Sequence, residues 1–441
     1  MTARRTTLVA ALAVAFGIAS VASRGHGRDR PQAPVVTAGP IARAIPPGAT
    51  VAEDEATLSR WLADPNGPEE IWLRGRDYRG DFSAERPVAI RGVQGTRIIG
   101  SGQGTVLTLA GRGSRLDNLI VRHSGRRQTR EDAAVRATAA DIVIERVQVE
   151  DALFGIVLGP CERCRIEHSH VIGRPEDPLQ GDGIKLWEAS HAAVRDCFVE
   201  GTRDVVVWYS RHVSLARNTV TGSRYGTHFM YAHDSSVEDS ELTRNVVGIF
   251  VMYSSRLTIE RNRLTGAGGP AGVGIGFKES DGATVSGNWF VADTTGTYLD
   301  RTPRSAATPV RFHGNHFALN DVALSFHSSE EGLEFSDNEF TSNATVIQVE
   351  GGGNALTANF RNNSWSDYQG YDLDHDGRGD IPYQVKVLSS ELNEREPALR
   401  LFSGTAAFAV IDLIARASPV FASRLLLEDP APKLHVQRGP S

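Results

Sequence analysis

Short apolar and polar runs alternate along most of this chain, and the pattern recurs at a spacing close to 22 residues. In ten aligned copies of six residues, the first and sixth places are always apolar. The copies start 21 to 28 residues apart, and the longer spacings contain Gly and Pro clusters typical of loop insertions. They are IERVQV (144–149), IEHSHV (166–171), VRDCFV (194–199), LARNTV (215–220), VEDSEL (237–242), IERNRL (259–264), VSGNWF (285–290), FHGNHF (312–317), FSDNEF (335–340) and FRNNSW (360–365).

A second apolar strand follows the copies, as in GIVL, GIKLW, DVVVW, GTHFM, GIFVM and GIGFK. Alternation with a period of two, Gly at the bends and this repeat length predict an all-β fold, a right-handed parallel β-helix or solenoid. Each coil of such a fold buries its inner face only against neighbouring coils. The segment 88–109 is expected to form the first coils.

The fourth place of the repeat is Asn in six of the ten copies. A column of Asn amides at one turn, each bonded to the next coil, satisfies polar groups inside a stack of strands. We therefore expect six side chains to stack at a single turn: Asn218, Asn262, Asn288, Asn315, Asn338 and Asn363.

Both ends of such a stack expose strand edges that need covers. The segment 53–64 has the pattern of a capping helix, and the segment 397–430 is rich in helix formers. We predict four parts: a signal peptide over 1–23, a linker over 24–50, a β-helix with its N-terminal cap over 51–384, and a C-terminal helical cap or docking segment over 385–441.

The first residues predict export. Arg4 and Arg5 precede an apolar stretch over 7–22, and its last three residues fit a small-x-small cleavage site. The stretch is short for a spanning helix, so a cleaved signal peptide is favoured and an uncleaved anchor is the alternative.

The amino-acid composition excludes few classes of protein. Hydrophobic residues make up 40% of the chain and charged residues 23%, which is ordinary for a soluble protein. The net charge of −6 gives no sign of nucleic acid binding. Cys161 and Cys164 form a C-x-x-C, and Cys197 is the third cysteine. They predict one disulfide or buried thiols in preference to zinc, which needs four ligands.

Aligning the second strands places two columns on the outer face of one sheet. The first column is Trp187, Trp208, Met230, Met252 and Lys278, and the second is Lys185, Val206, His228, Phe250 and Gly276. Three tyrosines, Tyr209, Tyr231 and Tyr253, follow the first column directly, and the last two are expected to stack.

An outward column of Trp and Met needs an explanation, because a solvated sheet face carries Thr, Lys and Glu. A loop covers it, sugars stack on it, another protein docks on it, or Cu(I) binds its two thioethers and the imidazole of His228. The candidate copper or client-docking residues are His228, Met230, Met252, Trp187, Trp208, Phe250, Tyr231 and Tyr253.

A second candidate site lies in WSDYQGYDLDHDGRGDIPY (365–383), which contains D-x-D-x-D-G-x-x-D. Carboxylates at alternate positions before a Gly allow a short loop to wrap Ca²⁺. The twelfth place is Tyr383 instead of Glu, so the loop is not a full EF-hand, and a solvated acidic turn is the alternative. The predicted ligands are Asp372, Asp374, Asp376, Arg378 through its carbonyl, and Asp380 directly or through water.

Several of these motifs together resemble the NosD family. They are PVAIRGVQGTRIIGSGQGTVLTL, GDGIKLW, RYGTHFMY, GIFVMYS and NSWSDYQGYDLDHDGRGDIPY, and the resemblance covers residues 50–430. It implies a periplasmic accessory protein that assists copper-centre maturation of nitrous oxide reductase together with an ABC transporter. It also implies transient Cu(I) binding, and membrane contact only through the transporter. The Cys161 and Cys164 pair is not part of this resemblance.

A polysaccharide lyase, epimerase, hydrolase or sugar-binding protein is the alternative. Asp182, Lys185, Asp204 and His228 lie near the outward columns and would supply acid–base groups. However, the Asp-Pro-His-Glu motif of alginate epimerases is absent, as are the Asp-Asp and Gly-His-Gly motifs of polygalacturonases in the mature coils. We therefore expect a maturation factor that is not an enzyme.

Overall fold

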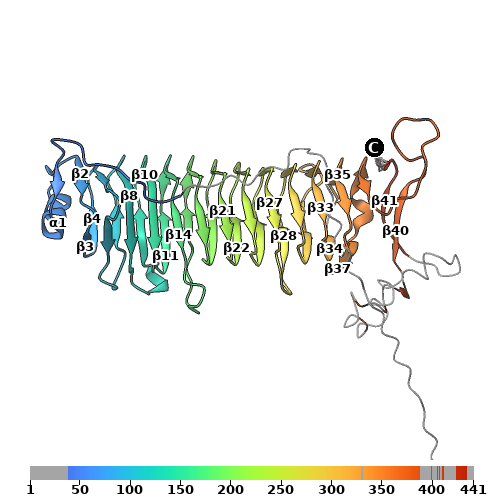
Figure 1. Cartoon of the computed structure of the whole chain (residues 1–441). Coiled ribbons are helices and arrows are strands. Elements are labelled where there is room, and N and C mark those ends of the chain that lie inside the picture. The colour runs from blue at the N-terminus through green and yellow to red at the C-terminus, as the bar shows by residue number, and fades with distance from the viewer. Residues whose placement is uncertain are drawn as a thin grey trace, which may run out of the picture. The chain divides into compact units, whose positions relative to one another are not determined.

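The computed structural model describes residues 38–328, 331–387 and 424–434, with a few isolated positions before the last range. In this part of the chain, parallel strands are stacked coil upon coil (Figure 1). They form a 25-stranded sheet A, which holds two strand columns, and a 12-stranded sheet B. The all-β parallel solenoid predicted from the repeat is confirmed.

Each coil contributes one strand to each column, and β8 and β10 span both columns of sheet A. The first column of sheet A contains β1 (Val51–Ala52), β2 (Glu70–Leu73), β5 (Ala89–Arg91), β8 (Arg115–Arg122), β10 (Val143–Glu150), β13 (Arg165–Glu167), β17 (Ala193–Arg195), β20 (Ser214–Ala216), β23 (Ser236–Glu238), β26 (Thr258–Glu260), β29 (Thr284–Ser286), β32 (Val310–His313), β35 (Leu333–Ser336) and β38 (Asn359–Arg361). The second contains β3 (Asp77–Arg79), β6 (Arg97–Ile99), β14 (His170–Ile172), β18 (Phe198–Glu200), β21 (Thr219–Thr221), β24 (Glu241–Thr243), β27 (Arg263–Thr265), β30 (Trp289–Val291), β33 (His316–Ala318), β36 (Glu339–Thr341) and β39 (Ser364–Trp365).

Sheet B carries the candidate site. Its strands are β4 (Phe82–Ala84), β7 (Leu107–Leu109), β9 (Ala133–Ala137), β11 (Phe154–Leu158), β15 (Ile184–Trp187), β19 (Asp204–Trp208), β22 (Tyr225–Met230), β25 (Val247–Met252), β28 (Val273–Lys278), β31 (Thr295–Asp300), β34 (Val322–His327) and β37 (Thr345–Glu350). Two short strands, β12 (Cys161–Glu162) and β16 (Ala189–Ser190), pair separately, and η1 (Gln128–Arg130) and η2 (Ala355–Thr357) are single 3₁₀ turns. The stack begins earlier than the predicted first coils, because β2, β3 and β4 precede them.

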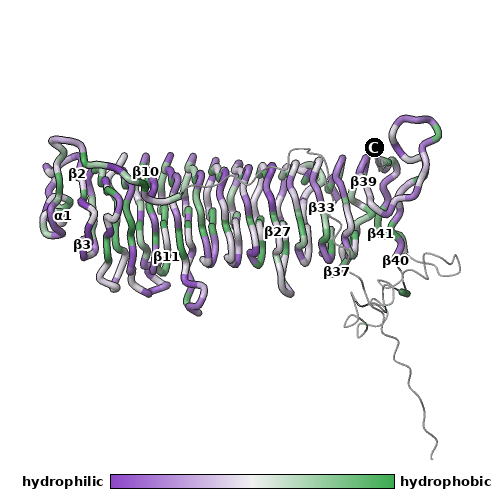
Figure 2. The backbone as a smooth tube through the Cα atoms, in the orientation of Figure 1, coloured by the Kyte–Doolittle hydropathy of each residue, from purple (hydrophilic) through white to green (hydrophobic). Residues whose placement is uncertain are grey.

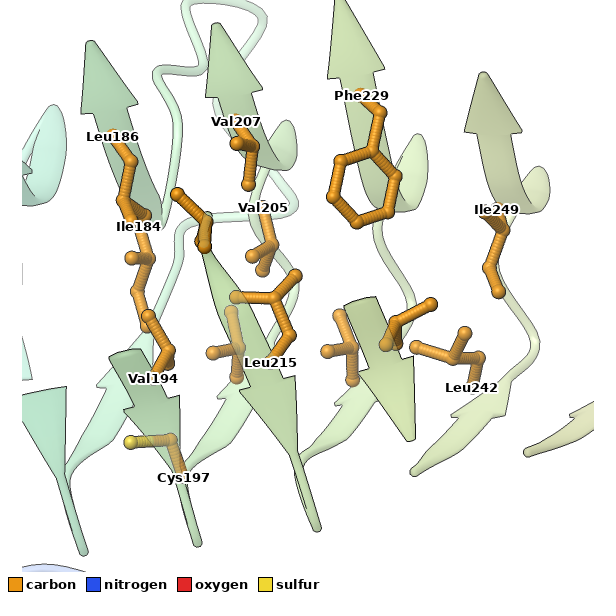
Figure 3. Close-up of a cluster of buried hydrophobic side chains, with 14 of the residues drawn as sticks. Ile184, Leu186, Val194, Cys197, Val205, Val207, Leu215, Phe229, Leu242 and Ile249 are labelled. Atoms are coloured by element: carbon orange, nitrogen blue, oxygen red, sulfur yellow. The ribbon is translucent and has the colours of Figure 1, made fainter. Parts of the chain in front are cut away.

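The core follows the period-two pattern. Val207 lies opposite Phe229, which lies opposite Val251, and all three side chains are fully buried. Figure 3 shows side chains of this kind directed inward from both sheets, and Figure 2 shows apolar and polar residues alternating along each coil. Because each coil has the same inner profile, every coil buries its apolar face against the next.

The predicted asparagine column is confirmed, because all six side chains are buried. The backbone N–H of Asn262 donates to Oδ1 of Asn288 at 2.9 Å, and that of Asn288 donates to Oδ1 of Asn315 at 2.9 Å. The same bonds continue through the later coils, and Ser240 takes the place of an amide between Asn218 and Asn262. The column thus ties neighbouring coils together at one turn.

The N-terminal capping helix predicted over 53–64 is present as α1 (Glu55–Ala63). Asp54 caps it by accepting the backbone N–H of Thr57 at 2.7 Å, and Leu58 and Leu62 are buried toward the first coils. Residues 38–50, assigned to a linker, lie along sheet A, where the N–H of Gly39 donates to the carbonyl of His168 at 2.7 Å. The predicted signal peptide lies outside the described residues and stays a prediction.

The C-terminal helix predicted over 397–430 lies largely outside the described residues, and at its described end the prediction is wrong. Arg424–Asp429 is strand β41, which pairs antiparallel with β40 (Tyr383–Val387). Burial of Leu426 and Leu427 against the last coils overrides the helix propensity of a leucine-rich run. Elsewhere, Cys161 and Cys164 form the predicted disulfide, and Cys197 is a buried free thiol.

Candidate functional site

The two outward columns of sheet B have the register that the sequence predicts. Trp187 pairs with Trp208, Trp208 with Met230, and Met230 with Met252, each on the next parallel strand. His228 lies two residues before Met230, in the second column. Neighbouring strands lie about 4.8 Å apart, so the two methionine side chains are direct neighbours.

His228 owes its position to a bulge in β22. Asp204 lies opposite Tyr225, whereas Val206 lies opposite His228, so β22 holds one residue more than β19 over this stretch. Gly226 is in the bulge, and a Cβ there would lie 2.6 Å from a carbonyl oxygen of the next coil. A bulge re-aims the side chains that follow it. Here it places the imidazole of His228 diagonally across from the carboxylate of Asp204.

The His228 side chain is buried in a polar and aromatic setting. Its ring lies edge-on to Tyr225, at 4.8 Å between centroids, and to Phe250, at 6.4 Å. Nε2 is 3.4 Å from Sδ of Met252, and Nδ1 is 3.7 Å from Oδ2 of Asp204. The imidazole therefore presents one nitrogen to a thioether and the other to a carboxylate.

Asp204 is almost fully buried and paired with Arg224. Nε of Arg224 donates to Oδ1 at 2.9 Å, and its Nη2 donates to Oδ2. Burial works to raise the pKa of Asp204, but the contacts with His228 and Arg224 outweigh it and hold the pKa below the ordinary value. The carboxylate beside His228 is thus negatively charged at neutral pH.

The first column is not buried beneath a loop in the described part of the chain. Trp187 of this column is 38% exposed, Trp208, Met230 and Met252 are half-buried, and Tyr209, which follows Trp208, is 51% exposed. Tyr209 stacks on Tyr231 and Tyr231 stacks on Tyr253, with 5.0 Å between ring centroids in both pairs, as predicted for the second pair. These rings form an aromatic stack beside Met230. Its exposure favours docking or metal binding over a covered core as the role of this face.

The groups that a polysaccharide-active enzyme would use are engaged in ion pairs. Nε and Nη2 of Arg203 donate to Oδ1 and Oδ2 of Asp182, at 2.9 and 3.0 Å, and Lys185 pairs with Glu131. Burial, reinforced by the charge of Asp204 and opposed by Arg203, raises the pKa of Asp182 to about 6. Asp182 and Lys185 are thus held by ion pairs within this chain.

Three of the five predicted calcium ligands come together in the loop before β40 (Figure 1). Carboxylate oxygens of Asp372, Asp374 and Asp376 lie within 4.8 Å of one another. Asp380 is not in this group and instead accepts the backbone N–H of Leu373 at 2.7 Å. Slight burial works to raise the pKa of Asp372, but backbone N–H groups such as that of Gly377 outweigh it and lower the pKa.

The backbone N–H of Arg378 donates to Oδ1 of Asp376 at 2.8 Å, so this residue closes the turn. No described contact involves its carbonyl oxygen as a ligand. Calcium binding at this loop stays a prediction.

Tyr225 and Arg224, which contact His228 and Asp204, were not among the predicted site residues. Their signal was present, because the coil spacing changes from 21 residues at Asp204 to 22 at Val206, and Gly226 stands where it changes. A one-residue change at a Gly indicates a bulge, and a bulge indicates a re-aimed side chain.

A family model described as "Periplasmic copper-binding protein (NosD)" matches residues 163–370. The "Probable ABC transporter binding protein NosD" of Pseudomonas aeruginosa is 29% identical over 363 residues, covering 78% of this chain and 84% of the relative. The protein of the same description from Stutzerimonas stutzeri is 27% identical over 381 residues, covering 81% and 85%.

Among solved structures, the catalytic unit of a GH87 α-1,3-glucanase from Streptomyces thermodiastaticus superposes with a TM-score of 0.56, at 14% identity over 75% of this chain and 70% of that chain. A GH87 α-1,3-glucanase catalytic domain in complex with nigerose gives 0.53, at 10% identity over 71% and 68%. At such identity the likeness shows the β-solenoid fold alone. None of the helices in the described part of the chain has the length and apolar character needed to cross a bilayer.

Proposed function

We propose that this chain is a member of the NosD family that carries copper in the periplasm for the maturation of nitrous oxide reductase, working beside an ABC transporter. The description of the family supports copper binding and the periplasm. The descriptions of the two relatives support a transporter partner. The reductase as client rests on the motifs that resemble the family.

The copper site we propose consists of His228, Met230 and Met252. Thioether and imidazole donors suit Cu(I), and hard cations prefer oxygen ligands. The contact of 3.4 Å between Nε2 of His228 and Sδ of Met252 carries the proposal. Bonds of zinc to imidazole nitrogen and to sulfur are about 2.0 and 2.3 Å, so two donors at this separation suit one small metal ion. All three ligands are neutral, which favours transient binding of a cargo.

Competition between the protein and a chromogenic Cu(I) chelator tests the site. Met230→Leu with Met252→Leu keeps the volume and apolar character of both side chains but removes the sulfurs, so Cu(I) binding should be lost. His228→Ala should lose it too. His212→Ala is the matched control, because this imidazole is exposed and lies outside the site. Unchanged Cu(I) affinity in the double methionine variant would refute the site.

We propose that the aromatic residues around the metal site bind the client. Trp187, Trp208, Phe250, Tyr231 and Tyr253 surround the methionines on one face, and Trp and Tyr are typical anchors of protein interfaces. Trp187→Ala should weaken binding of the reductase several-fold in a pull-down or by calorimetry, with Cu(I) affinity unchanged. Wild-type binding of the reductase by this variant and by Trp208→Ala would contradict a docking role.

A further inference from the structure

The two nitrogens of His228 face groups of different chemistry. A neutral imidazole carries one N–H and one lone pair, and its neighbours decide which nitrogen holds the proton. Oδ2 of Asp204 faces Nδ1, and Sδ of Met252 faces Nε2. A carboxylate is a strong hydrogen-bond acceptor and a thioether is a weak one, so the proton belongs on Nδ1.

We propose that Asp204 is a positioning residue: it holds the N–H of His228 at Nδ1 and so leaves the Nε2 lone pair directed at Met252 and the metal. This inference rests on the proposed copper site and names a further residue on which that site depends. Metal-binding histidines commonly donate their second nitrogen to a carboxylate, which fixes the tautomer and the ring orientation.

The surroundings of Asp204 suit this role. Arg224 holds both carboxylate oxygens from the next coil, so the group cannot rotate freely. Tyr225 and Phe250 stack on each other, and both rings lie edge-on to the imidazole and restrict its tilt. The distance of 3.7 Å between Nδ1 and Oδ2 is about 0.5 Å beyond an ordinary hydrogen bond, and such pairs commonly tighten when the ligand binds.

Nε2 and the sulfur of Met252 then face each other with lone pairs across 3.4 Å. Two electron-rich atoms in such contact gain nothing from each other. A soft cation between them removes that conflict.

The competing explanation is that Asp204 only stabilises the turn through Arg224. The chain offers a matched control, because Asp196 is held by Arg217 with the same pair of coil-to-coil bonds, at 2.7 and 2.6 Å, on a different face. A merely structural role predicts that Asp204→Asn and Asp196→Asn behave alike.

The test has two readouts. Long-range ¹H–¹⁵N correlation spectra of histidine-labelled apo protein report the tautomer of His228, which is assigned by comparison with His228→Ala. We expect the Nδ1–H form in the wild type and a mixture in Asp204→Asn. Cu(I) affinity should fall 10–100-fold in Asp204→Asn and stay within twofold in Asp196→Asn.

If Asp204→Asn leaves Arg224 unpaired and fails to fold, Asp204→Asn with Arg224→Gln removes both charges and takes its place. An Nε2–H tautomer in the wild type overturns the inference, as does unchanged affinity without Asp204. The two proposals fail separately: an Nδ1–H tautomer that depends on Asp204, in a protein that binds no Cu(I), supports the positioning role and overturns the copper site.

Discussion

Asn363 and Asp429 are joined by two hydrogen bonds, because the backbone N–H and the side-chain Nδ2 of Asn363 both donate to Oδ2 of Asp429, at 3.0 and 2.9 Å. The asparagine column therefore ends at the last coil, where Asn363 contacts a carboxylate of β41 that lies 66 residues further along the chain. Nε1 of Trp365 donates to the same oxygen at 3.3 Å. One buried oxygen thus satisfies three donors and fastens β41 to the last coil of the solenoid.

Replacing Asp429 should destabilise the C-terminal end. Asp429→Ala leaves buried donors without an acceptor, at a cost of roughly 1–3 kcal/mol for each group left unpaired. Asp429→Asn keeps one oxygen acceptor and should lose less. Urea unfolding followed by tryptophan fluorescence measures both, and equal stability of the alanine variant and the wild type would contradict this account.

Asp293 should make stability depend on pH. It is buried in a column that continues with Asn320 and Asn343 in the next two coils, and its Oδ2 has no hydrogen-bond partner among the described residues. Burial raises the pKa of Asp293 to about 8, although the N–H groups of Ala267 and Gly266 oppose this. Because the folded-state pKa is raised, the contribution of Asp293 to stability is fully present below the unfolded pKa of 3.8 and is lost as the pH rises from there through 8.

Asp293→Asn should therefore raise the melting temperature at pH 8 and leave it nearly unchanged at pH 4. The amide has an acceptor in the neighbouring coil, as Asn320 does when its Nδ2 donates to the carbonyl of Phe290 at 3.1 Å. Melting curves at both pH values measure the effect. A variant with the same pH dependence as the wild type would show that another group titrates.

Calcium should stabilise the loop over 372–380. Asp374→Ala with Asp376→Ala removes two of the three clustered carboxylates, so the melting temperature in calcium should fall to that in chelator. Asp380→Asn, outside the cluster, is the control and should keep most of the calcium effect. Identical melting curves of the wild type with and without calcium would remove the site.

Gly226→Ala should disturb the copper site without a change at any ligand. The added Cβ would lie 2.6 Å from the carbonyl oxygen of Gly248, so the bulge must shift and carry His228 with it. Gly268→Ala is the control, because its nearest atom would be an ordinary 3.8 Å away. We expect weaker Cu(I) binding and a lower melting temperature only for Gly226→Ala, and the chelator competition decides.

Much of this architecture could be predicted because the repeat length sets the register of a solenoid. Once Met230 and Met252 stand one coil apart, their pairing on neighbouring strands follows, and the asparagine column follows in the same way. The position of each side chain on the inner or outer face needs only the period of two.

The contacts of His228 could not be predicted in this way. Alternation places a residue on a face, but the bulge before His228 and the arginine that anchors Asp204 depend on how two coils differ. The helix prediction near the C-terminus was wrong for another reason. Leucines near 425 favour a helix locally, and only the buried surface of the last coil converts them to a strand.

Because of the bulge at Gly226, this chain should tolerate insertions and deletions in some segments and not in others. Extra residues in the turns between coils, such as the insertion over 174–182 before β15, leave every strand in phase. A deletion of one residue inside β22 would instead rotate each side chain that follows to the opposite face. Natural variants of this protein should therefore gain and lose residues freely at the corners of the solenoid, while the number of residues within β22 stays constant.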